Sequence, residues 1–213
     1  MIFEHLKKRL IKEQSLNNTI IENDENNNND KKLLFSKDDL LKPTKSAFIE
    51  PNNKECERVV TKTLMEEMVK LGCLPPVIKC KPCKEESFGY FEPGSGLTIC
   101  NNIKTYSVTL RNTILHEMIH AYDTCRYDLD TDNCIHLACT EIRAANLSGD
   151  CKFSQELGRG NLHIYNHMAD CTKRRAIKSL EAHPKCKANA ELSVLKAWEK
   201  CNTDYSPFTT IPK

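Results

Sequence analysis

The stretch "TILHEMIHAYD" at residues 113–123 contains His116, Glu117 and His120, a spacing that suits metal-dependent hydrolysis. Histidines at positions i and i+4 of a helix project from one face with Cβ atoms about 6 Å apart, so both imidazoles can reach one ion. Glu117 can then stand beside the ion without ligating it. From there it can take a proton from a metal-bound water that attacks a peptide carbonyl, and return it to the leaving amine. The motif therefore predicts a zinc hydrolase with Glu117 as the catalytic residue.

The neighbours of the motif favour this interpretation over a chance pair of surface or core histidines. Ile114 and Leu115 precede the motif, Met118 and Ile119 lie inside it, and no Pro or Gly interrupts the run. A helix that carries a buried active site needs this apolar background. A short motif has a false-positive risk of its own, so its context supports the prediction.

A hydrolytic zinc ion normally has three protein ligands and one open position, so a third ligand is expected. We prefer Glu141, which follows His120 by 21 residues in "CTEIRAANLSGD" and lies on a predicted second helix. A glutamate from a helix packed antiparallel to the first can reach the ion. His136, Asp123 and Asp150 are alternatives. Asp123 lies three residues after His120 on the same helix, which better suits a partner that orients an imidazole.

The elements that must position these residues are helices around a small sheet. Apolar residues at helical spacing predict helices over 53–71, 107–123, 133–148, 161–182 and 186–200. Short β-prone pieces between Pro and Gly residues predict an antiparallel sheet with strands at 77–80, 88–91 and 97–100. The expected fold is an α+β domain in which helices predominate.

Composition divides the chain into a tail and a domain. Half of the residues from 17 to 30 are asparagine, interleaved with acids. Such a stretch lacks the apolar side chains that offset the entropy of ordering, so residues 1–48 are predicted to be a disordered, low-complexity tail. Residues 49–206 are the predicted zinc peptidase domain, and residues 207–213 a C-terminal tail.

Charge and hydropathy exclude some partners. The chain has 31 Lys and Arg against 29 Asp and Glu, so no bulk field favours nucleic acid, and none is expected as a partner. No apolar run approaches the roughly 20 residues that span a bilayer. The N-terminus has neither the apolar core of a secretory signal nor the acid-free composition of a mitochondrial matrix presequence.

Twelve cysteines all lie between residues 56 and 201. A dense, even set suggests disulfides and an oxidising compartment. Without a secretory signal, the mitochondrial intermembrane space is a compartment that fits. The competing interpretation is a cysteine zinc site, because Cys80 and Cys83 form a C-x-x-C. It is less favoured, since no second pair has suitable spacing.

Three other features are assigned structural roles. His163 and His167 have the i, i+4 spacing but no adjacent carboxylate, which favours a solvated helix face. Arg143 is predicted to make a buried ion pair. The basic run "KRR" at 173–175 is predicted to be a solvated helix face rather than a binding patch.

Three stretches carry a family resemblance: "GYFEPGSGLTICNN", "TLRNTILHEMIHAYDTCRYD" and "HLACTEIRAANLSGDC". In order and spacing they resemble the mitochondrial inner-membrane peptidases that also serve as ATP-synthase assembly factors, over about residues 52–202. The resemblance implies a zincin-like fold, zinc ligation by His116 and His120, and catalysis by Glu117. It implies a peripheral position on the intermembrane-space face of the inner membrane. It does not settle the third ligand.

The resemblance also implies a substrate. The expected reaction removes the N-terminal propeptide from the precursor of a membrane-embedded ATP synthase subunit, with a chaperone-like role in Fo assembly. In zincins an extended substrate commonly adds to an edge strand beside the zinc helix, and "GLTICNN" at 96–102 is the expected strand, the alternative being a strand with no substrate role. The alternative function is a non-catalytic, disulfide-stabilised assembly chaperone with a dispensable zinc site.

Overall fold

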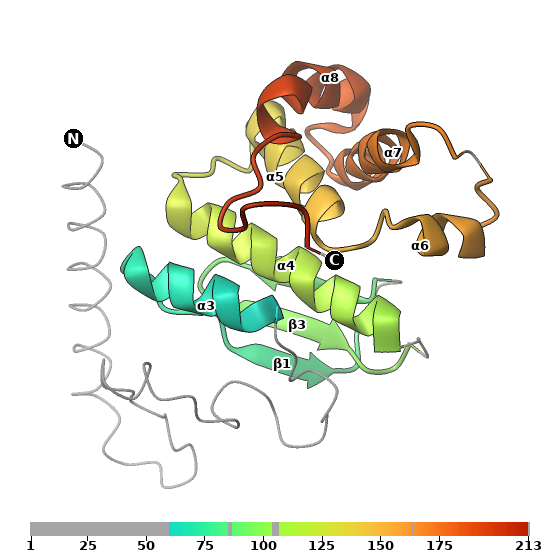
Figure 1. Ribbon diagram of the computed structural model, residues 1–213. Helices are drawn as coiled ribbons and strands as arrows, with labels where there is room; N and C mark the ends of the chain where they lie inside the picture. The colour runs from blue at the N-terminus through green and yellow to red at the C-terminus, as the bar shows by residue number, and fades with distance from the viewer. Residues whose placement is uncertain (1–59, 85–86, 104–106, 163, 213) are drawn as a thin grey trace, which may run out of the picture. The chain divides into compact units, whose positions relative to one another are not determined.

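The computed structural model describes residues 60–84, 87–103, 107–162 and 164–212. The helix α4 lies over the sheet beside α3, while α5, α7 and α8 lie beyond α4 (Figure 1). No described helix is both long and apolar enough to cross a membrane. In chain order the elements are α3 (Val60–Lys70), β1 (Ile78–Lys81), β2 (Gly89–Glu92), β3 (Gly96–Cys100), α4 (Ser107–Arg126), α5 (Cys134–Leu147), α6 (Phe153–Gly158), α7 (His167–Ala182), the 3₁₀ helix η2 (Lys187–Asn189) and α8 (Ala190–Cys201).

The three strands lie close to their predicted positions, but their arrangement corrects two predictions. The strand order is β1-β3-β2, with β3 parallel to β1 and antiparallel to β2. The sheet is therefore mixed, not antiparallel. β3 is its central strand, so the prediction of an edge strand at 96–102 is wrong. The reason lies in side-chain burial: four of the five β3 residues are buried, whereas β1 and β2 alternate with exposed positions, and the most apolar strand takes the centre.

Gly96 lets β1 approach the start of β3. Its φ is +98°, and a Cβ there would lie 2.5 Å from the carbonyl oxygen of Val77. That same oxygen accepts a hydrogen bond from the backbone N–H of Leu97 at 2.9 Å. A side chain at position 96 would thus displace the first contact between the two parallel strands.

Local signals account for the helix boundaries that the sequence left approximate. α5 begins at Cys134 because the side chain of Asn133 accepts hydrogen bonds from the N–H groups of Ile135 and His136. α7 begins at His167, six residues later than predicted, after Asn166 in a left-handed conformation with a φ of 55°. The short helix α6 was not predicted. The start of the predicted helix at 53–59 and the tail at 1–48 lie outside the described residues.

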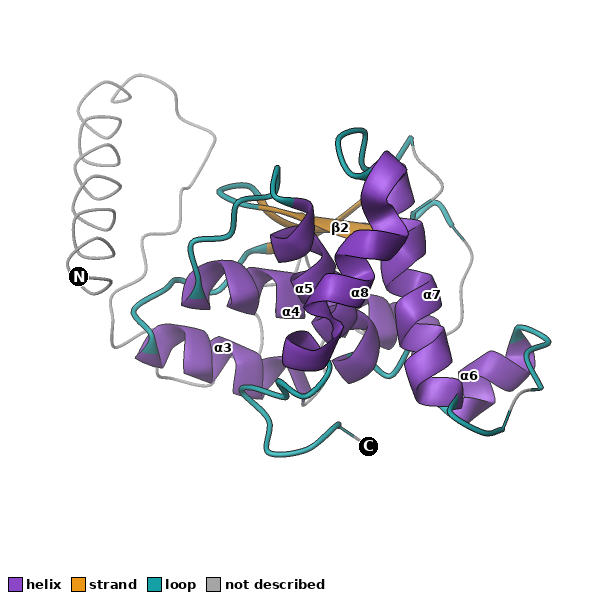
Figure 2. Cartoon of the chain, turned by 90° about the horizontal axis from the view of Figure 1, so that it is seen from above, coloured by secondary structure: helices purple, strands orange, loops and turns teal. Residues whose placement is uncertain are grey.

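Two apolar clusters lie on either side of α5. The first packs α3, the sheet and α4 against Ala144 and Leu147 of α5, and the second packs Ala138 and Ile142 of α5 against α7 and α8 (Figure 2). The segment that the sequence sets apart as a C-terminal tail contributes Phe208 and Ile211 to the first cluster. α5 is thus held from both sides.

Five disulfides connect the described elements, and they favour the disulfide interpretation over a cysteine zinc site. Cys83 of the C-x-x-C pairs with Cys100 at the end of β3. The other pairs are Cys73–Cys125, Cys134–Cys186, Cys139–Cys201 and Cys151–Cys171. Cys56 lies outside the described residues. Cys139–Cys201 ties α5 to α8, and Cys134–Cys186 ties α5 to the connection between α7 and η2.

Removing the Cys139–Cys201 bond by the double alanine variant should cost more stability than removing Cys83–Cys100. The paired residues are 62 apart in the first case and 17 in the second. Loop-closure entropy in the unfolded chain then gives losses of about 4 and about 3 kcal/mol. Urea unfolding of the two double variants beside the wild type measures both values. A smaller loss at Cys139–Cys201 would contradict the expectation.

Candidate metal centre

α4 and α5 bring His116, His120 and Glu141 together. The two carboxylate oxygens of Glu141 face the two histidines: Oε2 lies 3.5 Å from Nε2 of His116, and Oε1 lies 3.6 Å from Nε2 of His120. One donor atom from each residue lies within 4.8 Å of the others, and no other such group occurs in the described part of the chain. Around a tetrahedral zinc ion with bonds of 2.0–2.1 Å, neighbouring donor atoms are about 3.4 Å apart. The three side chains therefore fit one such ion.

The other three candidate ligands do not belong to this group of donor atoms. His136 is exposed on the first turn of α5, and five residues of helix turn it about 140° away from Glu141. Asp150 lies beside the site, where its Oδ2 is 3.6 Å from Nδ1 of His116, the nitrogen on the far side from Glu141. Asp123 is 2 % exposed and contacts His120 only through another residue.

That intermediate residue is Thr140, which sequence analysis missed although it directly precedes Glu141. Its Oγ1 donates to Oδ2 of Asp123 at 3.0 Å and lies 2.9 Å from Nδ1 of His120. Because the hydroxyl proton is used on Asp123, the Thr140 oxygen accepts from the N–H at Nδ1 of His120. The unprotonated Nε2 then faces Glu141, which is the tautomer that metal ligation needs.

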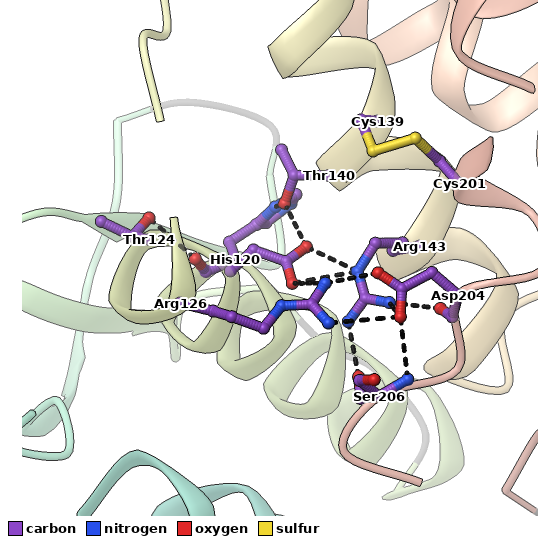
Figure 3. A network of polar contacts seen from close by, with 10 residues as sticks. His120, Thr124, Arg126, Cys139, Thr140, Arg143, Cys201, Asp204 and Ser206 are labelled. Carbon is purple, nitrogen blue, oxygen red and sulfur yellow. Dashed lines mark hydrogen bonds and ion pairs between the residues drawn. A yellow bond between two sulfur atoms is a disulfide. The ribbon is translucent and has the colours of Figure 1, made fainter. Parts of the chain in front are cut away.

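Asp123 is held in turn by Arg143, and this confirms the buried ion pair predicted for that arginine. Nε of Arg143 donates to both Asp123 carboxylate oxygens at 2.9 and 3.0 Å, and the arginine is 1 % exposed. Figure 3 shows that the same guanidinium reaches the C-terminal segment, where it donates to the carbonyl oxygens of Asp204 and Ser206. Arg126 of α4 donates to the Asp204 carboxylate. Residues after α8 thus complete the support of His120.

His116 has its own carboxylate partner. Asp150 follows α5 and accepts a hydrogen bond from Arg175 of α7 at 2.8 Å. Burial lowers the pKa of His116, but Asp150 and Glu141 outweigh it and raise the pKa to about 10. Burial raises the pKa of Glu141, but His120, His116 and the hydroxyl of Ser179 outweigh it and bring the pKa to about 2. Without a metal, the pocket holds a protonated imidazole between two carboxylates.

Glu117 belongs to α4, and its carboxyl group is reached by the backbone of Phe91 in β2. Burial raises the pKa of its carboxyl to about 7, although the charge of His116 and a hydrogen bond from the backbone of Phe91 both lower it. A carboxyl group with a pKa near 7 can both accept and return a proton at neutral pH.

The other basic and histidine features have structural surroundings. His163 lies outside the described residues, and the His167 ring packs edge-to-face on Phe153 at 5.5 Å between centroids. The run at 173–175 is not simply solvated, because Arg174 pairs with Glu156 at 2.5 Å and Arg175 pairs with Asp150.

Substituting Arg143 by Met should destabilise the fold by about 3–5 kcal/mol, because it leaves the buried Asp123 carboxylate without its partner. Adding Asp123→Asn should restore part of that loss, since the uncompensated charge is then absent. Urea unfolding of both variants measures the difference.

A matched control breaks an exposed pair. Lys185→Met removes the contact with Asp132, whose two side chains are 62 % and 59 % exposed, and should cost 1 kcal/mol or less, at about the level of ordinary surface pairs. Equal losses for Arg143→Met and Lys185→Met would contradict the role given to Arg143.

Comparison with known proteins places the chain in a family. Residues 50–209 match the model of the Peptidase M76 family. The chain is 37 % identical over 172 residues to "Mitochondrial inner membrane protease atp23" of Schizosaccharomyces pombe, covering 74 % of this chain and 93 % of that protein. It is 43 % identical over 138 residues to the protein of the same name from Coccidioides immitis, covering 63 % of this chain and 58 % of that relative. No solved structure matches the chain.

These names agree with the peptidase activity and the mitochondrial inner-membrane location that the sequence predicts. The matched range contains all of α3 to α8, and with them His116, Glu117, His120 and Glu141. By its sequence the chain belongs to the Peptidase M76 family.

Proposed function

We propose that this chain is a zinc metalloendopeptidase in which His116, His120 and Glu141 hold one Zn²⁺ and Glu117 is the catalytic residue. The observation that carries the proposal is that both carboxylate oxygens of Glu141 face the two Nε2 atoms, at 3.5 and 3.6 Å. Zinc held there supplies a Lewis acid for the peptide carbonyl and makes a water more acidic. The helix α4 carries His116, Glu117 and His120 and lies beside a small sheet. This arrangement supports a zincin-like fold.

In this proposal the protein residues handle the protons. Glu117 takes the proton of the attacking water and delivers it to the nitrogen of the leaving amine. Thr140 and Asp123 hold His120 with Nε2 towards the ion, as described above. Asp150 lies on the opposite nitrogen of His116 and orients that ring.

An extended substrate is proposed to pair with β2, not with the central strand β3. β2 is hydrogen-bonded to β3 on one side and is an edge strand of the described sheet. Its residue Phe91 reaches Glu117 through its backbone. A peptide added along this edge by main-chain hydrogen bonds would pass beside the catalytic carboxyl.

The proposed substrate is the precursor of a membrane-embedded ATP synthase subunit, which loses its N-terminal propeptide and is assisted into Fo. The proposed location is peripheral, on the intermembrane-space side of the inner membrane. The relatives' names support a location at the inner membrane, and the five disulfides support an oxidising compartment. The family resemblance supports the substrate.

Glu117→Gln should abolish cleavage while zinc binding and folding persist, because the amide cannot accept a proton and Glu117 does not ligate the ion. The expected loss of kcat is at least about 10²-fold. A peptide-cleavage assay with zinc stoichiometry measures both effects. Glu181→Gln on the exposed face of α7 is the control and should cleave normally.

Normal cleavage by Glu117→Gln would reject the mechanism. If ATP synthase assembly continues in cells that carry this variant alone, the chaperone-like role is separable from proteolysis.

Zinc affinity should rise with pH through the neutral range. In the metal-free protein the pKa of His116 is about 10, so zinc must displace a proton from its imidazole; the pKa of His120 is lowered, so that ring is already neutral. One displaced proton makes the apparent affinity rise about tenfold per pH unit below this pKa. Calorimetric titration of Glu117→Gln in buffers of different ionisation enthalpy measures the release without the contribution of Glu117. Binding without proton release would contradict this charge assignment.

A further inference from the structure

A loop closed by a disulfide projects beside the metal centre. Cys151 and Cys171 are both fully buried and joined to each other, and the chain between them forms α6, the connection to α7 and the first turn of α7. Figures 1 and 2 show α6 and this connection at the side of α7. We call residues 151–171 the disulfide-closed loop. Its base is covalently held to the domain.

The tip of the disulfide-closed loop is apolar and solvent-exposed. Leu162, Ile164 and Tyr165 are 71 %, 74 % and 80 % exposed, and they are three of the four most exposed large apolar side chains in the described part of the chain. Phe153 and Leu157 add to this surface from α6 at 39 % and 50 % exposure, one helical turn apart. Single exposed apolar residues are ordinary, but such a group marks an interaction surface.

The surroundings of this tip are cationic. Residues 150–175 contain five Lys or Arg and three Asp or Glu, a net charge of +2. Two of the three acids are buried: Glu156 is 2 % exposed and pairs with Arg159 and Arg174, and Asp150 is 6 % exposed and pairs with Arg175. Positive charge therefore remains at the surface beside the apolar tip. Apolar side chains flanked by cations are the pattern of proteins that bind anionic lipid surfaces.

We propose that the disulfide-closed loop docks the protein on an anionic phospholipid bilayer, with Leu162, Ile164 and Tyr165 entering the headgroup boundary. Tyr suits that depth, because its ring is apolar and its hydroxyl stays hydrated. This surface would bind the protein to the inner membrane, and the proposal does not depend on the proposed cleavage chemistry.

The loop is also joined to the metal centre. Arg159 donates to the backbone carbonyl of Asp150 at 2.6 Å, and the Asp150 carboxylate faces His116 at 3.6 Å. Docking through the tip thus holds the centre close to the bilayer surface, where it can reach segments that emerge from the membrane.

The test is vesicle flotation of the full chain with the triple variant Leu162→Ser, Ile164→Ser and Tyr165→Ser. Wild type should float with vesicles that mix phosphatidylcholine and phosphatidylglycerol, and should float less with phosphatidylcholine alone or in high salt. The triple variant should lose at least about tenfold in partitioning, because the apolar contribution is removed. The exposed residues Leu74 and Leu195, at 71 % and 66 %, provide the matched control: their double serine variant should float like wild type.

A second variant reports insertion directly. The tryptophan fluorescence of Ile164→Trp should shift to shorter wavelength when the mixed vesicles are added, and brominated lipid should quench it. The wild type, which contains only Trp198, gives the background signal. Flotation of the triple variant equal to wild type, or an unshifted Ile164→Trp emission, would overturn the proposal. A triple variant that floats like wild type but differs from it in molecular mass in solution would also overturn the proposal, since the surface would then join two copies of the chain. Peptide cleavage in solution plays no part in these outcomes.

Discussion

The ion pair between Asp123 and Arg143 is the interaction on which the candidate metal centre depends. It joins α4 to α5 at a point where both residues are almost fully buried. A buried carboxylate and guanidinium are stable only when their remaining hydrogen-bonding groups are used. Here Asp123 also accepts from Thr140, and Arg143 also donates to two carbonyl groups after α8. The orientation of His120 is therefore determined by residues from three separate parts of the chain.

The two histidines are supported in different ways. His120 contacts the neutral hydroxyl of Thr140, which in turn is hydrogen-bonded to Asp123, while His116 faces Asp150 directly. Each of the two carboxylates is paired with an arginine. The metal-free pKa values differ accordingly: the pKa of His116 is raised and that of His120 is lowered. A dication bound between them would displace the proton on His116 and place its charge beside the carboxylates of Glu141 and Asp150, so the pocket is electrostatically suited to a cation.

Sequence patterns predicted what depends on local spacing. The i, i+4 histidines, the apolar periodicity of α4 and the Gly and Pro punctuation of the strands all lie within one element, and those elements formed where expected. The glutamate on a second helix was inferred from its distance along the chain, and α5 brings it to the two histidines. Contacts between elements could not be predicted from such patterns. The role of Thr140 depends on how α4 and α5 are rotated relative to each other, and the central position of β3 depends on how all three strands pair. The left-handed Asn166 that delays α7 has no periodic signal.

The disulfide between Cys139 and Cys201 has a consequence for how this support assembles. Cys139 directly precedes Thr140, and Cys201 lies three residues before Asp204, so one covalent bond joins the two pieces of backbone that meet at Arg143 (Figure 3). The bond raises the effective concentration of the C-terminal carbonyl groups at the guanidinium, because it shortens the connection between Arg143 and Asp204 from 61 residues to a few. Oxidation of Cys139 and Cys201 thereby stabilises the orientation of the His120 imidazole, which contacts Thr140 beside Cys139.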